Sequence, residues 1–225
     1  MDNLDGLISA TVAGNLPRRE FLAKAAAIGV SAVALAEITR ALDVHAEVAA
    51  AGLNTLTLNA VQVFGNFDPA IGIDYTQEMA QINFYDTLLT ATPSAGVTGR
   101  LADHFTASAD AKNFTFYLKK GVKFHSGHEL TAEDVIYSMQ RVLAIGQGPS
   151  FVWKGFLTQD SVKALDRYTV RFTLSQPFAP FPSTLPLLFI VDKATVISKQ
   201  KPGKFGTNGD YGQAFLASNE AGSGP

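Results

Sequence analysis

Apolar and polar residues alternate along three segments of the chain, and this period of two predicts β-strands with one buried face. In residues 53–61, Leu56, Leu58 and Ala60 share one side and polar residues share the other. The apolar sides of the other two segments are Phe114, Phe116 and Leu118, and Tyr168, Val170, Phe172 and Leu174. Full burial of each such side chain contributes roughly 1.5–3 kcal/mol, so these strands are expected to pack on a core.

Two segments have the helical period of three to four residues. Residues 74–90 predict a helix with an apolar stripe of Met79, Ile82, Tyr85 and Leu89, capped by Asp74 or Thr76. Residues 131–146 predict a second helix, in which Thr131 and Asp134 form a capping box and Gly146 ends the last turn. The apolar stripe of this second helix is Val135, Met139 and Val142.

Glycine- and proline-rich stretches separate these elements. The segment 64–72 predicts a loop, residues 90–99 a connector between structural units, and the prolines from Pro177 to Pro186 a break in regular structure. A buried apolar run then leads into a short helix near residues 193–197. Together, the mixture of strands and helices predicts an α/β fold.

The N-terminal segment has the order of an export signal: basic residues, an apolar run and small residues. Arg18 and Arg19 precede Phe21 and Leu22, an arrangement that resembles the twin-arginine translocation motif. The apolar run 25–36 has 12 residues, fewer than the roughly 18 that a spanning helix needs. Residues 1–51 therefore predict a twin-arginine signal that is cleaved near Ala46 or Ala51. The alternative is an amphipathic first helix of the fold.

Composition excludes several classes of site and partner. The 225 residues carry a net charge of −2 without a basic stripe, so nucleic acid is not an expected partner. The chain has no cysteine, which excludes thiolate catalysis, zinc–thiolate sites and lipidation of a cysteine after export.

His125 and His128 are the candidate metal ligands, but they flank the Ser126–Gly127 turn and do not share a helix face. Exposed turn histidines are the favoured interpretation, and we expect no metal. No pattern predicts catalytic residues or a cofactor.

Several segments, in this order, resemble the N-terminal half of the extracellular solute-binding proteins of family 5, which serve dipeptide, oligopeptide and nickel ABC importers. They are "GRLADHF", "NFTFYLKKGVKFHSGHELTAEDVIYSMQRVL", "LDRYTVRFTLSQPFAPF" and the terminal "GSGP". The resemblance implies a type II periplasmic-binding-protein fold with an extra domain, here truncated and lacking lobe II. It places the start of lobe I at 53–92, the extra domain at 93–185 and an incomplete return to lobe I at 186–225.

The resemblance also implies a function: capture of a peptide or related small solute in the periplasm and delivery to ABC permease subunits, after export by the twin-arginine translocase. The alternatives are a non-transporting sensor or ligand-delivery protein of the same fold and, less favoured, an exported hydrolase. The candidate ligand contacts are Asn66 and Phe67, in the loop after the first predicted strand, with Tyr85 and Trp153. Core packing is the competing interpretation for Tyr85 and Trp153, and Asp68 is expected to be a turn residue.

Overall fold

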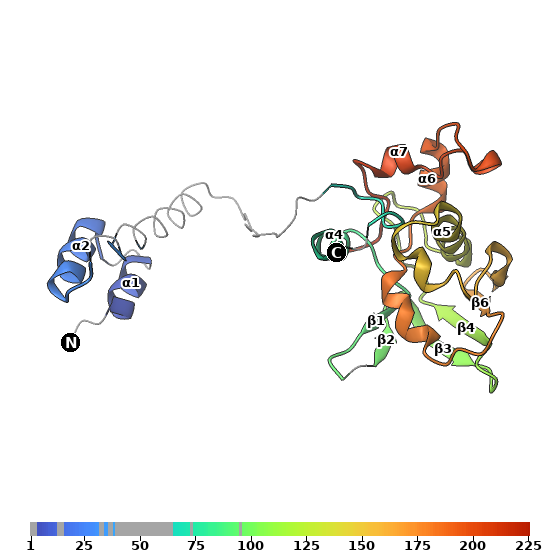
Figure 1. Ribbon diagram of the computed structural model, residues 1–225, viewed down its shortest axis with the longest axis horizontal. Helices are drawn as coiled ribbons and strands as arrows, with labels where there is room; N and C mark the ends of the chain where they lie inside the picture. Colours follow the sequence, from blue (N-terminus) through green and yellow to red (C-terminus); the bar gives the residue numbers. More distant parts are fainter. Residues whose placement is uncertain are drawn as a thin grey trace. The chain divides into compact units, whose positions relative to one another are not determined.

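The computed structural model describes residues 4–12, 16–31, 34–35, 38, 65–72, 74–94 and 96–225 (Figure 1). The chain divides into two compact units, Met1–Asn59 and Ala60–Pro225, which are treated separately below. The strand predicted over 53–61 and the cleavage sites predicted at Ala46 and Ala51 lie outside the described residues.

The first unit contains two short helices, α1 (Leu4–Val12) and α2 (Arg18–Ala27). They contact each other through a small buried cluster of Leu7, Leu16, Phe21 and Ala25. Pro17 precedes α2, and the predicted twin-arginine pair forms its first two residues. In the described part of the chain, every helix is too short or too polar to cross a membrane.

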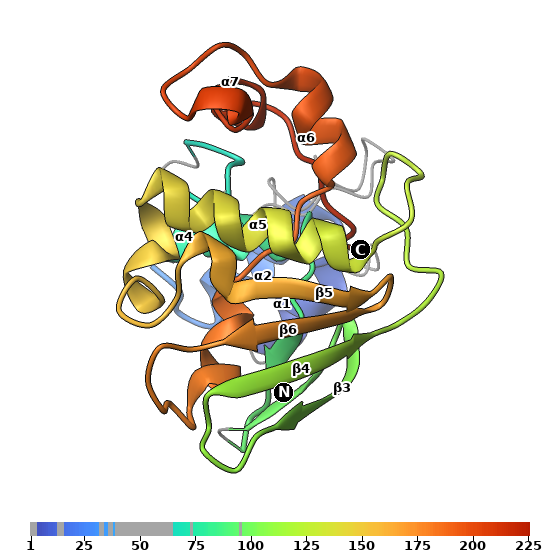
Figure 2. The same ribbon diagram turned by 90° about the vertical axis from the view of Figure 1, so that its right-hand side faces the viewer.

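The second unit is built on an antiparallel four-stranded sheet with the order β3-β4-β6-β5 (Figure 2). Its strands are β3 (Ala102–Ala107), β4 (Asn113–Leu118), β5 (Val162–Asp166) and β6 (Thr169–Thr173). Phe116 lies opposite Val170 and Phe114 opposite Phe172 in the central pair, and all four side chains are buried. The alternation predicted for residues 113–118 and 168–174 is therefore confirmed.

The helix α5 (Ala132–Ile145) packs along β5 and β6. Its predicted start and end are confirmed. The backbone N–H of Thr131 donates to the Asp134 carboxylate at 2.9 Å, and Gly146 adopts the left-handed conformation at φ 69°. The predicted apolar stripe of Val135, Met139 and Val142 is buried.

The remaining elements are short. They are β1 (Leu89–Ala91), β2 (Val97–Gly99), α4 (Tyr75–Gln81), α6 (Lys193–Lys199), α7 (Gln213–Leu216), and the 3₁₀ helices η1 (Gly148–Val152), η2 (Gln159–Ser161), η3 (Phe181–Leu187) and η4 (Gly206–Asn208). The predicted buried run before a short helix corresponds to residues 188–191 and α6.

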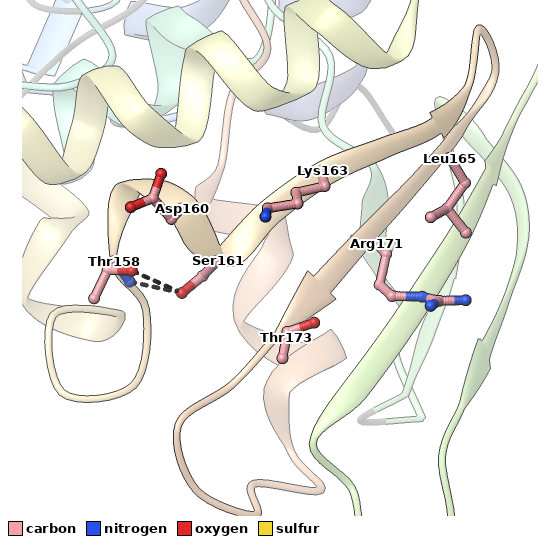
Figure 3. A pocket seen from close by; sticks show the side chains of 7 residues that line it. All are labelled: Thr158, Asp160, Ser161, Lys163, Leu165, Arg171 and Thr173. Carbon is pink, nitrogen blue, oxygen red and sulfur yellow. Dashed lines mark hydrogen bonds between the residues drawn. The ribbon is translucent and has the colours of Figure 1, made fainter.

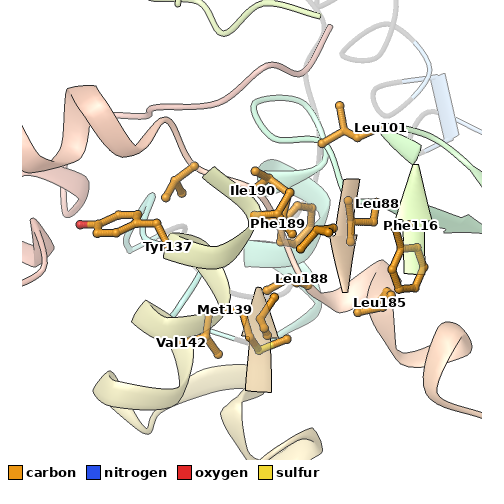
Figure 4. Close-up of a cluster of buried hydrophobic side chains, with 14 of the residues drawn as sticks. Leu88, Leu101, Phe116, Tyr137, Met139, Val142, Leu185, Leu188, Phe189 and Ile190 are labelled. Atoms are coloured by element: carbon orange, nitrogen blue, oxygen red, sulfur yellow. The ribbon is translucent and has the colours of Figure 1, made fainter. Parts of the chain in front are cut away.

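One core connects the sheet, α5 and the segment that follows η3 (Figure 4). Met139 and Val142 of α5 belong to this core together with Leu188 and Ile190, and Phe116 contributes from β4. The proposed boundaries near residues 92 and 185 both lie in segments that share this core. The division into a lobe and an extra domain stays a prediction.

Two predicted elements differ from the structure. The helix predicted over 74–90 ends at Gln81, with Ile82 as its C-cap, and Met79 and Ile82 are 38% and 55% exposed. The chain leaves the helix because its next backbone groups pair with distant segments: the Phe84 carbonyl accepts from Gly224 N–H and the Asp86 carbonyl from Ile190 N–H, each at 2.9 Å. The predicted cap Asp74 is confirmed, since its carboxylate accepts from Gln77 N–H at 2.9 Å.

The connector predicted over 90–99 is a β-hairpin. Its strands β1 and β2 pair antiparallel, with Thr90 opposite Thr98. Thr and Val favour strands, and here each strand is only three residues long, too short to show an alternating pattern.

Candidate functional site

The loop 65–72 is held in one conformation by side chains of its own and of α4. The Asn66 side-chain oxygen accepts from Asp68 N–H at 2.7 Å, and the Asp68 carboxylate accepts from Ala70 N–H at 2.9 Å. The Gln77 side-chain amide donates to the Asn66 carbonyl at 2.8 Å. Such aspartate and asparagine turns replace the missing secondary-structure hydrogen bonds.

The same loop is anchored by an ion pair inside the protein. The Arg141 guanidinium donates from both terminal nitrogens to the two Asp68 carboxylate oxygens, at 2.6 Å each. Its Nε donates to the Tyr211 carbonyl at 2.7 Å. The side chains of Arg141 and Asp68 are 1% and 0% exposed. A bidentate pair of this kind fixes both distance and orientation, so α5 sets the position of the loop.

Asp68 is a turn residue, as predicted, since its carboxylate accepts from Ala70 N–H. Its buried partner Arg141 was not predicted. A helical signal was nevertheless present. Asp134, Ser138 and Arg141 follow each other at four and three residues, and all three are buried on α5. A polar stripe at helical spacing beside the apolar stripe could have indicated buried partners.

Two residues of this polar stripe, Asp134 and Ser138, bind backbone N–H groups at the start of α6 and just before it. The Asp134 carboxylate accepts from Lys193 N–H, and the Ser138 hydroxyl accepts from Val191 N–H, at 3.0 Å each. Burial raises the pKa of Asp134, against the opposing effect of its hydrogen bonds from Thr131 and Lys193. The stripe therefore has a structural role, in joining α5 to residues 191–193.

Phe67 contacts Phe84, the residue that precedes Tyr85 in the chain. Phe67 meets the Phe84 ring edge-on, with centroids 5.2 Å apart. Tyr85 is 1% exposed and lines an open groove of about 370 Å³, together with Ile82, Asn83, Thr90 and Arg100. Burial raises the pKa of the Tyr85 hydroxyl far above the physiological range, so the hydroxyl stays neutral.

Trp153 lies in the core and has no exposed surface. Its indole N–H donates to the Thr184 hydroxyl at 2.9 Å. The structure thus places Asn66 and Phe67 on the anchored loop, Tyr85 at the groove and Trp153 in the interior. Ligand contact by these four residues stays a prediction.

The turn histidines contact two different segments: His125 contacts the C-terminal residues and His128 contacts the N-cap of α6. His125 Nε2 faces the Gly224 carbonyl at 2.8 Å and His125 Nδ1 faces the Glu220 carboxylate at 3.0 Å. Because both partners are acceptors, only the doubly protonated imidazolium satisfies both contacts. His128 Nδ1 lies 2.8 Å from the Asp192 carboxylate. Within the described ranges, no group of three or more potential metal ligands occurs.

This geometry predicts a pH-dependent contribution to stability. The Gly224 carbonyl and then Glu220 raise the pKa of His125 above its usual value of about 6.5. The contribution should therefore be complete below that value and be lost as the pH rises through the higher folded-state pKa. The difference in unfolding free energy between wild type and His125→Gln, measured by denaturation from acid to mildly alkaline pH, should shrink as the pH rises.

The partner replacement Glu220→Gln tests the cause of this effect. It removes one charged acceptor, so wild type and this variant should also converge at alkaline pH. A difference between wild type and His125→Gln that stays constant across the pH range would contradict the imidazolium contact.

Comparison with known proteins identifies the family. Residues 96–225 match the family described as "Bacterial extracellular solute-binding proteins, family 5 Middle". The chain belongs to this family. Its α/β scaffold, predicted as a type II periplasmic-binding-protein fold, is confirmed by solved family 5 structures. One is the periplasmic binding protein DppA from Helicobacter pylori in complex with the peptide STSA, with a TM-score of 0.56 and 29% identity over 71% of this chain and 33% of that chain.

Curated relatives of this family 5 chain support the same assignment. It is 40% identical over 163 residues to the probable D,D-dipeptide-binding periplasmic protein DdpA of Escherichia coli, covering 70% of this chain and 30% of the relative. It is 32% identical to di/tripeptide-binding protein 2 of Pseudomonas aeruginosa, covering 71% of this chain and 32% of the relative. The chain thus spans about a third of the length of these relatives.

Proposed function

We propose that the chain is part of the substrate-binding component of an ABC importer, which captures short peptides in the periplasm and delivers them to the permease subunits. The observation that carries this proposal is the 40% identity to the probable D,D-dipeptide-binding periplasmic protein DdpA. The fold shared with a relative solved in complex with a peptide supports it.

In this proposal the chain supplies one side of a ligand site. The anchored loop with Asn66 and Phe67, and the groove beside Tyr85, would present fixed polar and aromatic groups to a peptide. Relatives are about three times as long, and a two-lobed clamp closes on ligand from both sides. The chain alone is therefore expected to bind peptides weakly.

Titration of the purified 225-residue chain with short peptides tests this function. D-Ala-D-Ala, L-Ala-L-Ala and trialanine should shift backbone NMR resonances of the loop 65–72 and of the groove, saturably and in the millimolar range. Free alanine is the control. Absence of saturable shifts with every peptide, or equal shifts with alanine, would overturn peptide capture. Submicromolar affinity would contradict only the incompleteness of the site.

Gene context and peptide turnover distinguish the importer from the alternative functions. A gene next to permease genes favours an importer, whereas a gene next to those of a signalling protein favours a sensor or ligand-delivery role. Peptide turnover in the titrated samples, abolished by a single side-chain replacement, would favour an exported hydrolase.

Export by the twin-arginine translocase is part of the proposal. Conversion of Arg18 and Arg19 to lysine keeps the charge but removes the paired guanidinium groups, so the precursor should stay in the cytoplasm and remain unprocessed. The control Arg40→Lys makes the same chemical change outside the motif. Immunoblots of cytoplasmic and periplasmic fractions measure the outcome. Normal processing of the Arg18→Lys/Arg19→Lys protein would exclude this route.

A further inference from the structure

The four-stranded sheet has a second face, turned away from the core. Phe114, Phe116 and Phe172 point to the core, so the alternating residues of the same strands point to the opposite side. On this side of β5 and β6, Leu165 is 48% exposed and Lys163, Arg171 and Thr173 are also exposed, whereas Thr169 is buried. β5 carries one carboxylate on this side, Asp166, which lies opposite Thr169. The outward positions of β4 and β6 carry none; they are Asn113, Thr115, Tyr117, Thr169, Arg171 and Thr173.

Two cations lie directly opposite each other on this face. Lys163 of β5 is the cross-strand partner of Arg171 of β6. Like charges in such a pair destabilise a sheet. Neither side chain forms an ion pair with any carboxylate in the part of the chain that the structure describes. Arg171 Nε instead donates to the neutral Thr115 hydroxyl at 3.3 Å. The fold alone gives no electrostatic reason for this arrangement.

The two cations line a shallow pocket of about 390 Å³ (Figure 3). Their charged ends diverge: the Lys163 amine points toward the Thr158–Ser161 turn, and the Arg171 guanidinium lies below Leu165. A single small anion would therefore reach one charged end, whereas separate carboxylates along an extended chain would reach both. Asp160 is the carboxylate among the pocket residues and is not ion-paired with Lys163.

We propose that this outer sheet face is a docking surface for an extended, acidic segment of a partner protein. Two carboxylates of the segment would meet Lys163 and Arg171, and an apolar residue between them would pack on Leu165. The protein as a whole carries a net charge of −2, so the attraction is local to this face. The contacts would also relieve the repulsion within the cation pair. This surface is independent of the proposed peptide capture.

Fluorescence anisotropy tests the proposal with a labelled peptide of sequence Glu-Thr-Leu-Thr-Glu and its Gln-Thr-Leu-Thr-Gln counterpart. The glutamate peptide should bind the 225-residue chain at low salt and lose affinity as salt screens the exposed charges. The double variant Lys163→Gln/Arg171→Gln should weaken binding about fivefold to tenfold, as expected for two exposed ion pairs. The glutamine peptide should show the same loss.

The matched control is Lys199→Gln/Lys201→Gln, which removes the same charge from α6 and the loop after it. Equal weakening by this control, or no binding of the glutamate peptide, would overturn the proposal. Inorganic phosphate or anionic vesicles binding through Lys163 and Arg171 more tightly than the peptide would also overturn it, and would assign the face to another ligand.

Thermal unfolding gives a readout that does not depend on the peptide. Lys163→Gln should raise the unfolding midpoint, because it removes the repulsion with Arg171. A lowered midpoint would show that Lys163 is needed for packing, and would remove the electrostatic argument for a docking partner.

Discussion

Arg141→Met should destabilise the fold by roughly 3–5 kcal/mol, the cost of leaving one buried charge without its partner. Arg141 is the charged partner of Asp68, and both are fully buried, so the remaining carboxylate cannot be solvated without opening the core. Urea denaturation followed by circular dichroism measures the loss. The loop 65–72 should also lose protection from hydrogen exchange, because its anchor to α5 is gone.

Two further variants separate charge from packing. The double variant Asp68→Asn/Arg141→Met removes both charges of this pair, so it should be more stable than Arg141→Met alone. Arg167→Met, which removes an exposed arginine that pairs with Glu129 at 2.9 Å, should change stability little. If Arg141→Met were as stable as wild type, the buried ion pair would not hold the loop.

Trp153→Ala is expected to cost about 3–5 kcal/mol, as for other large aromatic side chains removed from a core. The indole is fully buried and is the single tryptophan of the chain, so unfolding must be followed by circular dichroism. Trp153→Phe keeps most of the volume and should cost less. The hydroxyl of Thr184 keeps its own contact, since it donates to the Phe181 carbonyl at 2.7 Å.

The control Phe151→Ala lies two residues away, where the ring is 67% exposed, and should change stability much less. Trp153→Ala also decides between the two interpretations of this residue. Loss of peptide binding with unchanged stability would assign Trp153 to the ligand site and contradict the packing interpretation.

Local sequence patterns were sufficient to predict the central strands and the ends of α5. In the sheet, the alternation of Phe114, Phe116 and Phe172 appears both in the sequence and in the core, because a strand's two faces follow directly from its backbone geometry. At α5, the Thr131–Asp134 capping box and Gly146 act within a few residues of the helix ends. Neither the strand alternation nor the helix caps depend on contacts with residues far away in the sequence.

The sequence pattern gave a wrong prediction at α4, where distant segments of the chain supply the contacts of the helix. The apolar spacing of Met79 and Ile82 indicated a buried stripe, but both are exposed, and the buried residues of α4 are Thr76, Gln77 and Gln81. The Gln81 side chain donates to the Asp68 carbonyl at 3.3 Å, a contact that depends on the loop conformation. The spacing of residues within α4 does not show that this contact will form.

By itself, the sequence determined the family, the central strands, the ends of α5 and the position of the histidine turn, because these depend on hydrophobic period, capping and segment order. Only the tertiary structure decided that Asp68 meets Arg141, that α4 ends at Gln81, and that Lys163 faces Arg171. The first two features depend on residues far apart in the chain, and the third on the register of the β5–β6 hairpin. Their free energies depend on burial and register, which exist only once the chain has folded.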